Sequence, residues 1–278
     1  MKRVIPFLLA VCALALTACQ ATTAPTAQTV AAQQTAAPST EKHQLYNLMI
    51  RRPQPGLGPD YDNFIRTEMN PLRIKGGIQQ MDVWTLASGG RGGRVVISPI
   101  ANFANLDNPI GISRALDPKA RDAFWQKHSR LLAEEESYTI EHLPALSWTS
   151  PNYKAGMQKA AVLRFIKVAP GREREYENYY RNVEIPARLK LLTQTTMLGQ
   201  WRYRVRFGGD SYGYVMIRPM VNFAELDDAK GLRELLGADA AQKLYDQLPQ
   251  GVVVADEACL LRYRPELSIA EGKLLAAK

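Results

Sequence analysis

The chain contains one pattern twice, and this repeat constrains its fold more than any other feature. Residues 95–107 read VVISPIANFANLD and residues 215–227 read VMIRPMVNFAELD, identical at eight of thirteen positions. Upstream, YDNFIR at 61–66 matches YENYYR at 176–181. Both pairs occur in the same order along the chain, at offsets of 120 and 115 residues. We therefore expect two tandem copies of about 110 residues that share one fold.

Each copy has the periodicity of strand, helix, strand, strand, helix and strand. Over 200–207 aromatic and apolar residues alternate with arginines, which predicts a strand with two different faces. The first copy is expected to have strands at 46–51, 79–86, 94–100 and 137–143, and helices at 60–75 and 117–133. The second copy is expected to have strands at 161–168, 200–207, 212–218 and 259–264, and helices at 176–191 and 225–247. Pro71 and Pro186 fall inside the first helix of each copy and predict a kink or a restart there.

This β-α-β-β-α-β order is that of the ferredoxin-like unit, whose sheet has one face covered by helices and one bare face. Two bare faces can cover each other, so a tandem pair has a physical reason to exist. Over residues 44–265 the arrangement resembles the dimeric α/β-barrel superfamily. The resemblance implies an α+β fold in which two tandem ferredoxin-like repeats close into a barrel within one chain. Because the repeats pair internally, we also expect a monomer.

The N-terminus has the features of an export signal. Lys2 and Arg3 precede an apolar stretch, 4–16, that is shorter than the ~20 residues needed to span a bilayer. The following Leu16-Thr17-Ala18-Cys19 is similar to the lipobox of bacterial lipoproteins. That resemblance implies cleavage before Cys19 and attachment of acyl chains to it, which anchors a protein stably to a membrane. Gln20 in place of Asp then implies the periplasmic face of the outer membrane; the alternative is ordinary secretion.

Residues 19–43 are almost entirely Ala, Thr, Gln and Pro, without an aromatic side chain. Such a segment cannot bury enough apolar surface to offset the entropy of ordering, so it is expected to be a flexible, lipidated tether. The predicted organisation is a signal peptide at 1–18, the tether at 19–43, a first repeat at 44–150, and a second repeat with a C-terminal tail at 151–278.

Composition narrows the possible partners. Lys and Arg outnumber Asp and Glu by 35 to 27, but the excess is spread along the chain without a basic run, so no nucleic acid is expected as a partner. Three cysteines make no disulfide framework and have no zinc-type spacing. Cys259, between Ala258 and Leu260, is interpreted as a small buried apolar residue. We expect neither a metal nor a bound cofactor.

Arginines on the strands of the second repeat are the leading candidates for ligand binding. Arg202, Arg204 and Arg206 share one strand face, and Arg164 and Arg262 belong to the same predicted sheet. If they pointed between the two sheets, they would form a cationic pocket for a carboxylate or phosphate. Tyr203 and Tyr214 beside them would suit an aromatic or carboxylated ligand. The alternative is that these arginines are solvated or ion-paired, because burying unpaired charges costs several kcal/mol each.

Two histidines and one repeated motif complete the candidates. His142, near a strand end, is a candidate for acid–base chemistry. His128 is expected on the surface of a helix, and the two lack metal-type spacing. The repeated Asn-Phe-Ala-x-Leu-Asp predicts that Phe103 and Phe223 pack the second helix of each copy onto its sheet.

Three functions remain open on this basis. The first is a non-catalytic module at the membrane that binds a small anionic or aromatic ligand, or an envelope partner. The second is an enzyme of the dimeric α/β-barrel type, either a cofactor-free monooxygenase or isomerase or, with less support, a haem-dependent one. The third is a structural envelope protein with a filled barrel. A cavity of a few hundred Å³ lined by Tyr and Arg would favour binding or catalysis over the structural role.

Overall fold

A computed structural model of the chain describes residues 44–275, apart from 90–91, 108–109, 155, 196, 209–212 and 229–231. The predicted signal peptide, the tether and Cys19 therefore lie outside the described residues. Eight strands of a nine-stranded sheet are long. They are β1 (Leu45–Pro53), β2 (Asp82–Ser88), β3 (Arg94–Ile100) and β4 (Leu132–His142) from the first repeat, and β6 (Ala160–Val168), β7 (Gly199–Phe207), β8 (Tyr214–Met220) and β9 (Val253–Tyr263) from the second.

The strands close into a barrel. Their order is β4-β1-β3-β2-β9-β6-β8-β7, and a further antiparallel pairing of β4 with β7 joins the two ends. Within each repeat the order is fourth, first, third and second strand, which is the order of a ferredoxin-like sheet. At the two seams between repeats, Trp84 pairs with Tyr263 and His142 pairs with Tyr203. The predicted fold class, two ferredoxin-like repeats forming one intramolecular α/β barrel, is confirmed.

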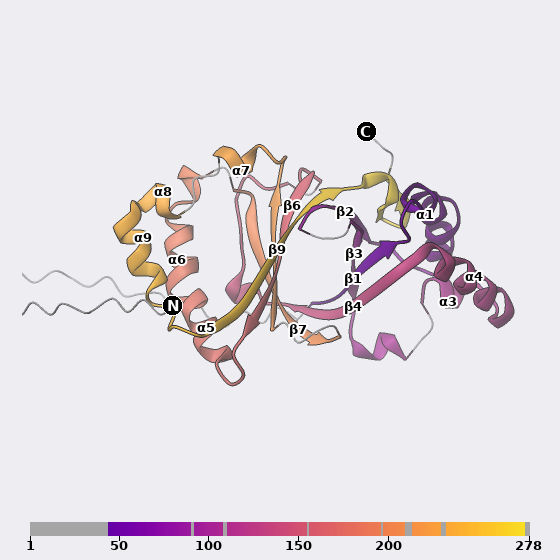
Figure 1. Cartoon of the computed structure of the whole chain (residues 1–278), viewed down its shortest axis with the longest axis horizontal. Coiled ribbons are helices and arrows are strands. Elements are labelled where there is room, and N and C mark those ends of the chain that lie inside the picture. Colours follow the sequence, from indigo (N-terminus) through magenta and orange to yellow (C-terminus); the bar gives the residue numbers. More distant parts are fainter. Residues whose placement is uncertain are drawn as a thin grey trace, which may run out of the picture. The chain divides into compact units, whose positions relative to one another are not determined.

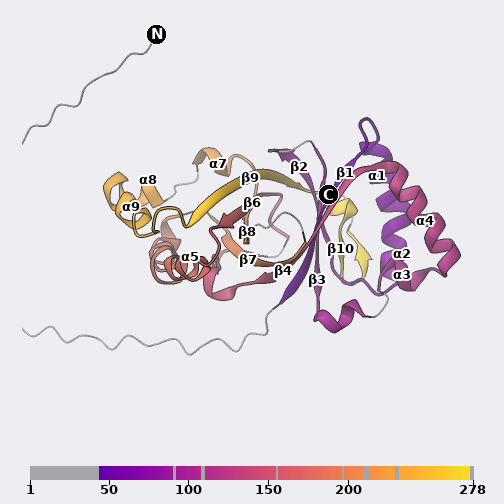
Figure 2. The ribbon, with the colours of Figure 1, turned by 60° about the horizontal axis from the view of Figure 1, so that its bottom comes forward.

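Helices cover the outside of this barrel, with α1–α4 over the strands of the first repeat and α5–α9 over those of the second (Figures 1 and 2). The first set is α1 (Gly58–Phe64), the π-helical turn η1 (Ile65–Met69), α2 (Asn70–Lys75), α3 (Ile112–Ala115) and α4 (Pro118–Leu131). The second set is α5 (Glu173–Tyr179), the π-helical turn η4 (Tyr180–Glu184), α6 (Ile185–Leu189), α7 (Glu225–Asp228), α8 (Leu232–Leu236) and α9 (Ala238–Tyr245).

The inside of the barrel is a packed apolar core through its middle. Alternate residues of the strands meet there, and Leu48, Ile140, Leu163, Val215 and Leu261 are fully buried in one cluster. Burying a side chain of this size stabilises a fold by about 1.5–3 kcal/mol, so this cluster joins the two repeats firmly. Any hollow space in the barrel is therefore confined to its two ends.

Both predicted proline breaks occur, and both take the same form. A π-helical turn, η1 or η4, directly precedes the short helix that carries Pro71 or Pro186 in its first turn. Proline lacks an N–H and its ring crowds the preceding turn, so the regular α-helical hydrogen bonds are interrupted just before it. The matching position in both repeats indicates that the break belongs to the duplicated unit.

Each repeat also fastens itself to the other through a short segment after its last strand. The segments contain η3 (Pro144–Leu146) and η6 (Pro265–Leu267), each followed by a serine, Ser147 or Ser268. The hydroxyl of Ser268 accepts from the backbone N–H of Val83 at 2.9 Å, and that of Ser147 accepts from the backbone N–H of Arg202 at 2.8 Å. We call the two segments, 143–149 and 264–270, the clasps. The short strands β5 (Trp148–Thr149) and β10 (Ile269–Ala270) lie within the clasps, and β11 (Lys273–Leu274) follows the second one.

Replacing Ser268 with alanine should lower the free energy of unfolding by about 1–3 kcal/mol, because the buried Val83 N–H loses its acceptor. Ser268 is fully buried and also donates to the carbonyl oxygen of Arg264 at 2.9 Å. Urea unfolding of the purified protein measures the change. Ser129→Ala, on the exposed side of α4, is the matched control and should change stability by less than about 0.5 kcal/mol. Equal stability of both variants would show that the clasp serine contributes nothing.

The surface gives one correction. Phe103 and Leu106 are 40% and 56% exposed, and Phe103 contacts Phe207 edge to face at 5.6 Å. The prediction that this motif packs a helix onto the sheet is therefore wrong for the first repeat.

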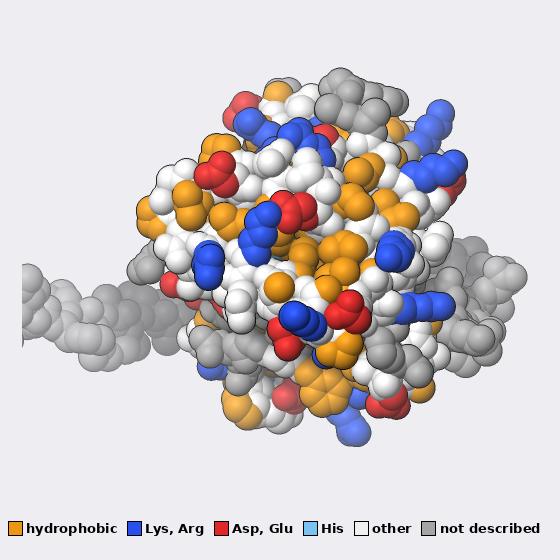
Figure 3. Space-filling model, turned by 90° about the vertical axis from the view of Figure 1, so that its right-hand side faces the viewer, with side chains coloured by type: hydrophobic (Ala, Val, Ile, Leu, Met, Phe, Trp, Pro, Cys, Tyr) orange, Lys and Arg blue, Asp and Glu red, His pale blue; other side chains and the backbone are white. Residues whose placement is uncertain are grey.

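On the face over α1–α4, Lys and Arg side chains lie among Asp and Glu around an apolar centre (Figure 3). Within the described residues, no helix is both long and apolar enough to span a membrane.

Candidate functional site

One end of the barrel opens into a cavity of about 560 Å³, which we call the mouth. It lies where β1, β2 and β7 begin and where β3, β4, β8 and β9 end, so both repeats line it. Its aromatic lining consists of Tyr46, Trp84, Tyr153, Trp201, Tyr203 and Tyr263. Its polar lining includes Asp82, His142 and the amides of Gln44, Gln80 and Gln158.

The aromatic rings of the mouth hold one another in place. Tyr46 meets Tyr203 edge to face with ring centroids 5.5 Å apart. Trp84 and Tyr263, which pair across one seam, have centroids 4.8 Å apart. Such offset and edge contacts are favoured by the ring quadrupoles, and they leave little rotamer freedom. The mouth is therefore a preformed pocket with flat apolar walls, a shape that suits a planar ligand.

Asp82 is the carboxylate in this lining. The hydroxyl of Tyr263 donates to its Oδ1 at 3.1 Å. Burial raises the pKa of the Asp82 carboxyl above its ordinary value, and the hydrogen bond from Tyr263 opposes this only in part. Burial, followed by the charge of Asp82, also raises the pKa of Tyr46 and of Tyr153. The tyrosines are thus hydroxyl donors at neutral pH, while Asp82 is a stronger base than an exposed aspartate.

His142 lies at the end of β4 in the wall of the same cavity. Its ring lies 5.2 Å from that of Tyr203, centroid to centroid, and its backbone N–H donates to the carbonyl of Gln44 at 2.9 Å. The structure therefore brings two of the sequence candidates, His142 and Tyr203, together with Asp82. The indole N–H of Trp84 is buried and has no hydrogen-bond partner among the described residues.

The arginines of β7 lie elsewhere. Arg202 is 2% exposed beneath α5 and η4, where it donates to the hydroxyl of Tyr176 at 2.8 Å and lies 3.4 Å from the ring centroid of Tyr180. Glu184 lies 3.7 Å from the same guanidinium group. Arg204 pairs with Glu177. These arginines therefore face the helices. The sequence predicted that they would point into the space between the two sheets, but Trp201, Tyr203 and Val205 of the same strand fill that space.

Most of the other predicted ligand-binding residues also have partners away from the mouth. Arg206 pairs with Glu141 at 2.9 Å, and Arg164 pairs with Asp256. Tyr214 lies on the helix side, where its hydroxyl donates to Glu177 at 2.7 Å. Strand alternation defines two faces, but it does not say which one meets the carboxylates of the covering helices. Of the predicted ligand-binding arginines, only Arg262 lies next to the mouth, in an adjoining hollow with Tyr263.

The structure also tests the predicted environments of Cys259 and His128. Cys259 is buried at the opposite end of the barrel, as expected, and burial raises the pKa of its thiol to about 11. His128 is 5% exposed, so its expected place on the surface is wrong. It packs among Tyr61, Phe64 and the other aromatic side chains of this helix layer. The helix periodicity did not separate His128 from the apolar stripe that it joins.

Acid should weaken the fold through His128. Burial, with a smaller contribution from the positive charge of Arg51, lowers the pKa of His128 to about 4. The unfolded chain takes up this proton near pH 6.5 and the folded chain does so only near pH 4, so stability is present above pH 6.5 and falls as the pH drops between these values. The loss amounts to about 3 kcal/mol when it is complete.

Urea unfolding at pH 7 and pH 4.5 measures this loss, with His128→Gln as the comparison. Glutamine keeps a polar partner for the hydroxyl of Tyr61, 3.4 Å from the imidazole Nε2, but it does not titrate. We expect the variant to lose less stability than the wild type between the two pH values. The same pH dependence in both proteins would contradict the assignment.

No protein-family model matches the chain, and no curated protein matches its sequence at a significant level. Solved structures do match. An anthrone oxidase-like protein superposes with a TM-score of 0.56 and 12% identity, over 86% of this chain and 98% of its own. A candidate monooxygenase of Fusobacterium nucleatum superposes with a TM-score of 0.54 and 11% identity, over 86% and 99%. The fold is that of the dimeric α/β-barrel proteins. A candidate monooxygenase of Lactobacillus acidophilus gives 0.52 and 10%, over 85% of this chain and all of its own.

At these identities the likeness shows the fold and leaves the chemistry to the residues of the mouth. Sequence reasoning missed most of them, including Asp82, Tyr46 and Trp84. A signal was present: Tyr46 and Asp82 stand at the starts of strands, and period-two alternation places Trp84 on the same face as Asp82. In the part of the chain that the structure describes, no three His, Cys, Asp or Glu side chains gather closely enough to hold a metal ion.

Proposed function

We propose that the mouth binds a small aromatic molecule with an acidic O–H or C–H group, and that the chain is an enzyme that removes this proton. The observation that carries the proposal is a cavity of about 560 Å³ that six aromatic side chains line together with Asp82. A cavity of this size and composition fits a molecule of two or three fused rings. A filled barrel with only a structural role would have no such space.

Asp82 is the group that we expect to take the proton. A general base works best when its pKa approaches the operating pH, and burial moves the pKa of Asp82 upward in that direction. The hydroxyl of Tyr263 holds the carboxylate in place from one side. The rings of Tyr46 and Trp84 offer flat apolar surfaces against which the rings of a planar aromatic substrate can pack. His142 is close enough to the same space to serve as a second proton acceptor or donor.

We further propose that the anion formed in this way reacts with dioxygen, as in a cofactor-free monooxygenase. Two of the similar structures are candidate monooxygenases and one is an anthrone oxidase-like protein. Anthrone has a methylene group between two aromatic rings, and loss of one proton yields an electron-rich anion. With dioxygen the methylene becomes a carbonyl; one oxygen atom enters the product, and the other leaves as water with the two hydrogens. Substrate, dioxygen and products then balance.

Oxygen uptake tests this proposal directly. Purified protein mixed with anthrone in air should consume one dioxygen for each quinone formed, well above the rate without protein, and should form no product under nitrogen. Rearrangement of a substrate without oxygen uptake would instead support an isomerase that uses the same base. Tight binding without any turnover would support the non-catalytic binding module and would contradict the enzyme.

The place of the protein in the cell is a separate proposal. The N-terminal pattern supports lipidation at Cys19 and anchoring at the periplasmic face of the outer membrane. Cys19→Ser should move the protein from the membrane fraction to the soluble periplasmic fraction of the producing cell. Unchanged fractionation of the variant would contradict the anchor. Because the barrel closes within one chain, we also propose a monomer, which gel filtration of that soluble variant tests.

A further inference from the structure

Two more hollows adjoin the mouth. One, of about 600 Å³, shares Gln44 and Gln80 with it, and the other, of about 630 Å³, shares Gln158 and Tyr263. Each shares wall residues with the mouth, so the three hollows lie next to one another at this end of the barrel. We call the first of the two the amide arm and the second the cationic arm. An elongated molecule whose middle lies in the mouth would place its two ends at the amide arm and the cationic arm.

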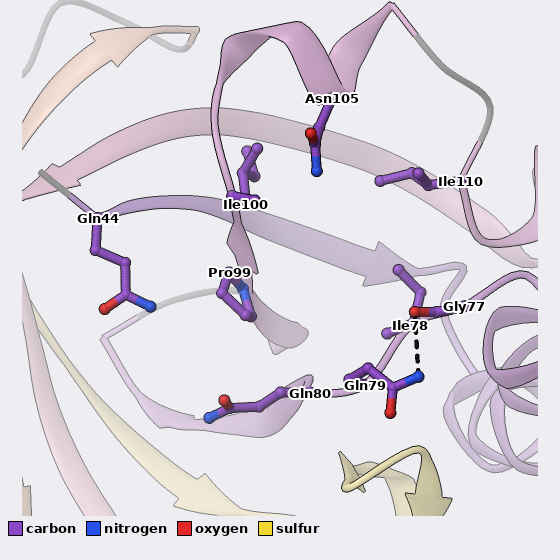
Figure 4. A pocket seen from close by; sticks show the side chains of 10 residues that line it. Gln44, Gly77, Ile78, Gln79, Gln80, Pro99, Ile100, Asn105 and Ile110 are labelled. Atoms are coloured by element: carbon purple, nitrogen blue, oxygen red, sulfur yellow. Dashed lines mark hydrogen bonds between the residues drawn. The ribbon is translucent and has the colours of Figure 1, made fainter. Parts of the chain in front are cut away.

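The amide arm carries no charged side chain. Its polar groups are the carboxamides of Gln44, Gln79, Gln80 and Asn105, and the side chains of Ile78, Ile100 and Ile110 supply apolar surface (Figure 4). Figure 4 shows these groups arranged around the hollow from the start of β1, the segment before β2 and the segment after β3. Carboxamides donate and accept hydrogen bonds without favouring either sign of charge, so this arm suits a neutral polar end of a ligand.

The cationic arm has the opposite chemistry. Arg262 and Lys159 line it together with Asn222, and the guanidinium carbon of Arg262 lies 5.6 Å from the ring centroid of Phe223. Among the described residues, no ion pair joins Arg262 or Lys159 to a carboxylate, whereas Arg164, Arg204 and Arg206 all have one. Both cations are exposed in the wall of the cationic arm, where a ligand of opposite charge can reach them.

The duplication gives Arg262 an acidic counterpart in the first repeat, Glu141. In the barrel, Glu141 pairs with Leu45 across β1 and β4, and Arg262 pairs with Ala160 at the corresponding place in β6 and β9. The two copies thus carry opposite charges at one structural position. Glu141 is satisfied by Arg206, but Arg262 is not satisfied by any acid of the described chain. The backbone N–H of Tyr263 donates to the carbonyl of Lys159 at 2.9 Å, which fixes the cationic arm beside the phenol that holds Asp82.

Resting on the proposed function, we propose that the substrate is an elongated aromatic carboxylate bound in one orientation. Its carboxylate lies in the cationic arm with Arg262 and Lys159, and its rings lie in the mouth. Its acidic O–H or C–H group faces Asp82, and any neutral polar end extends toward the amide arm. Arginine binds a carboxylate through charge-assisted hydrogen bonds, and the negative charge of Asp82 disfavours the reversed orientation. Arg262 and Lys159 are thus specificity-determining residues rather than catalytic ones.

The test uses 6-hydroxy-2-naphthoate and its methyl ester, which have the same rings and hydroxyl group but differ in charge. Titration calorimetry with the full chain at pH 7 should show the acid binding about ten- to a hundredfold more tightly than the ester. Arg262→Gln should remove most of this difference by weakening the acid alone, and Lys159→Gln should do so to a smaller extent. Arg233→Gln, which removes an exposed arginine on α8, is the control and should change neither affinity.

The outcomes separate the two proposals. If acid and ester bind the wild type equally, or if Arg262→Gln weakens both alike, the oriented carboxylate is excluded while the aromatic mouth stands. If neither compound binds, the mouth is not an aromatic site and the proposed function fails with it. Loss of affinity for the acid in Arg233→Gln as well would show a general charge effect and would also overturn the inference.

Discussion

Replacing Asp82 with asparagine should lower the turnover of anthrone about 10²- to 10⁴-fold, the usual contribution of a positioned general base. Asparagine has the shape of aspartate and its carbonyl oxygen can still accept from the hydroxyl of Tyr263, 3.1 Å away in the wild type. It cannot take up a proton. The affinity for substrate should therefore stay within about threefold of the wild type. Steady-state kinetics with oxygen uptake, together with a binding titration, measures both quantities.

The controls for this variant come from the same barrel. Glu136→Gln removes a carboxylate at the opposite end, where Glu136 pairs with Arg52, and should leave turnover unchanged. Asp82→Asn should also remain folded. Because the pKa of Asp82 is raised, its ionisation lowers stability as the pH rises through that value, and asparagine avoids this cost at pH 7. Full activity in a folded Asp82→Asn protein would remove Asp82 from the mechanism.

The pH profile gives an independent check on the same residue. Only the ionised carboxylate of Asp82 can accept a proton, so activity should rise with pH as Asp82 loses its own proton. Since burial raises this pKa, the rise should occur above the ordinary range of an aspartate. The residual activity of Asp82→Asn should lack this limb of the profile.

The largest effect on stability is expected for Arg202→Met, which should lower the free energy of unfolding by about 3 kcal/mol. The substitution removes the hydrogen bond to Tyr176, the contact with the ring of Tyr180 and one of the two cations near Glu184. Glu184 is itself only 5% exposed, so it would be left with Arg188 as its remaining cationic partner. Methionine fills a similar volume, which keeps the loss specific to charge and hydrogen bonding.

Arg164→Met is the matched comparison, because it removes an arginine from the helix side of the same sheet. Its partner is Asp256, and the pair is 42% and 29% exposed. Exposed pairs contribute about 0–1 kcal/mol, so this variant should differ little from the wild type in urea unfolding. Equal and small effects of both substitutions would mean that Arg202 does not bridge β7 to the helices as described.

The fold could be predicted from the sequence because a duplicated unit must make one architecture twice. The chain's two copies of one element order left a closed pair of sheets as the simplest way to cover both bare faces. The ends of the strands were harder to predict from the sequence. β4 begins at Leu132 rather than at 137, through a run of glutamates that pairs with Arg51 and Arg52 of β1. Consecutive glutamates do not show the alternation that indicates a strand. The arginines that pair with them lie about eighty residues away in the chain.

The clasps show a signal that was present but not used. Pro-Ala-Leu-Ser at 144–147 and Pro-Glu-Leu-Ser at 265–268 repeat at an offset of 121, so the duplicated unit extends past its last strand. The mouth was harder to foresee for a different reason. Its residues, such as Tyr46, Asp82 and Tyr263, are far apart in the chain and meet only because the barrel closes at two seams. Arg202, Arg204 and Arg206 form a visible pattern because they occupy every second position of one strand. Arg202 and Arg204 nevertheless join the sheet to its helices.

A structure of the protein with 6-hydroxy-2-naphthoate bound tests the central claim most directly. The account predicts the naphthalene rings in the mouth against Trp84 and Tyr46, the hydroxyl toward Asp82 and the carboxylate beside Arg262. The mouth should keep its aromatic walls, because they are preformed. Rings bound outside the barrel, or a mouth left empty at saturating ligand, would contradict the assignment of this cavity as the functional site.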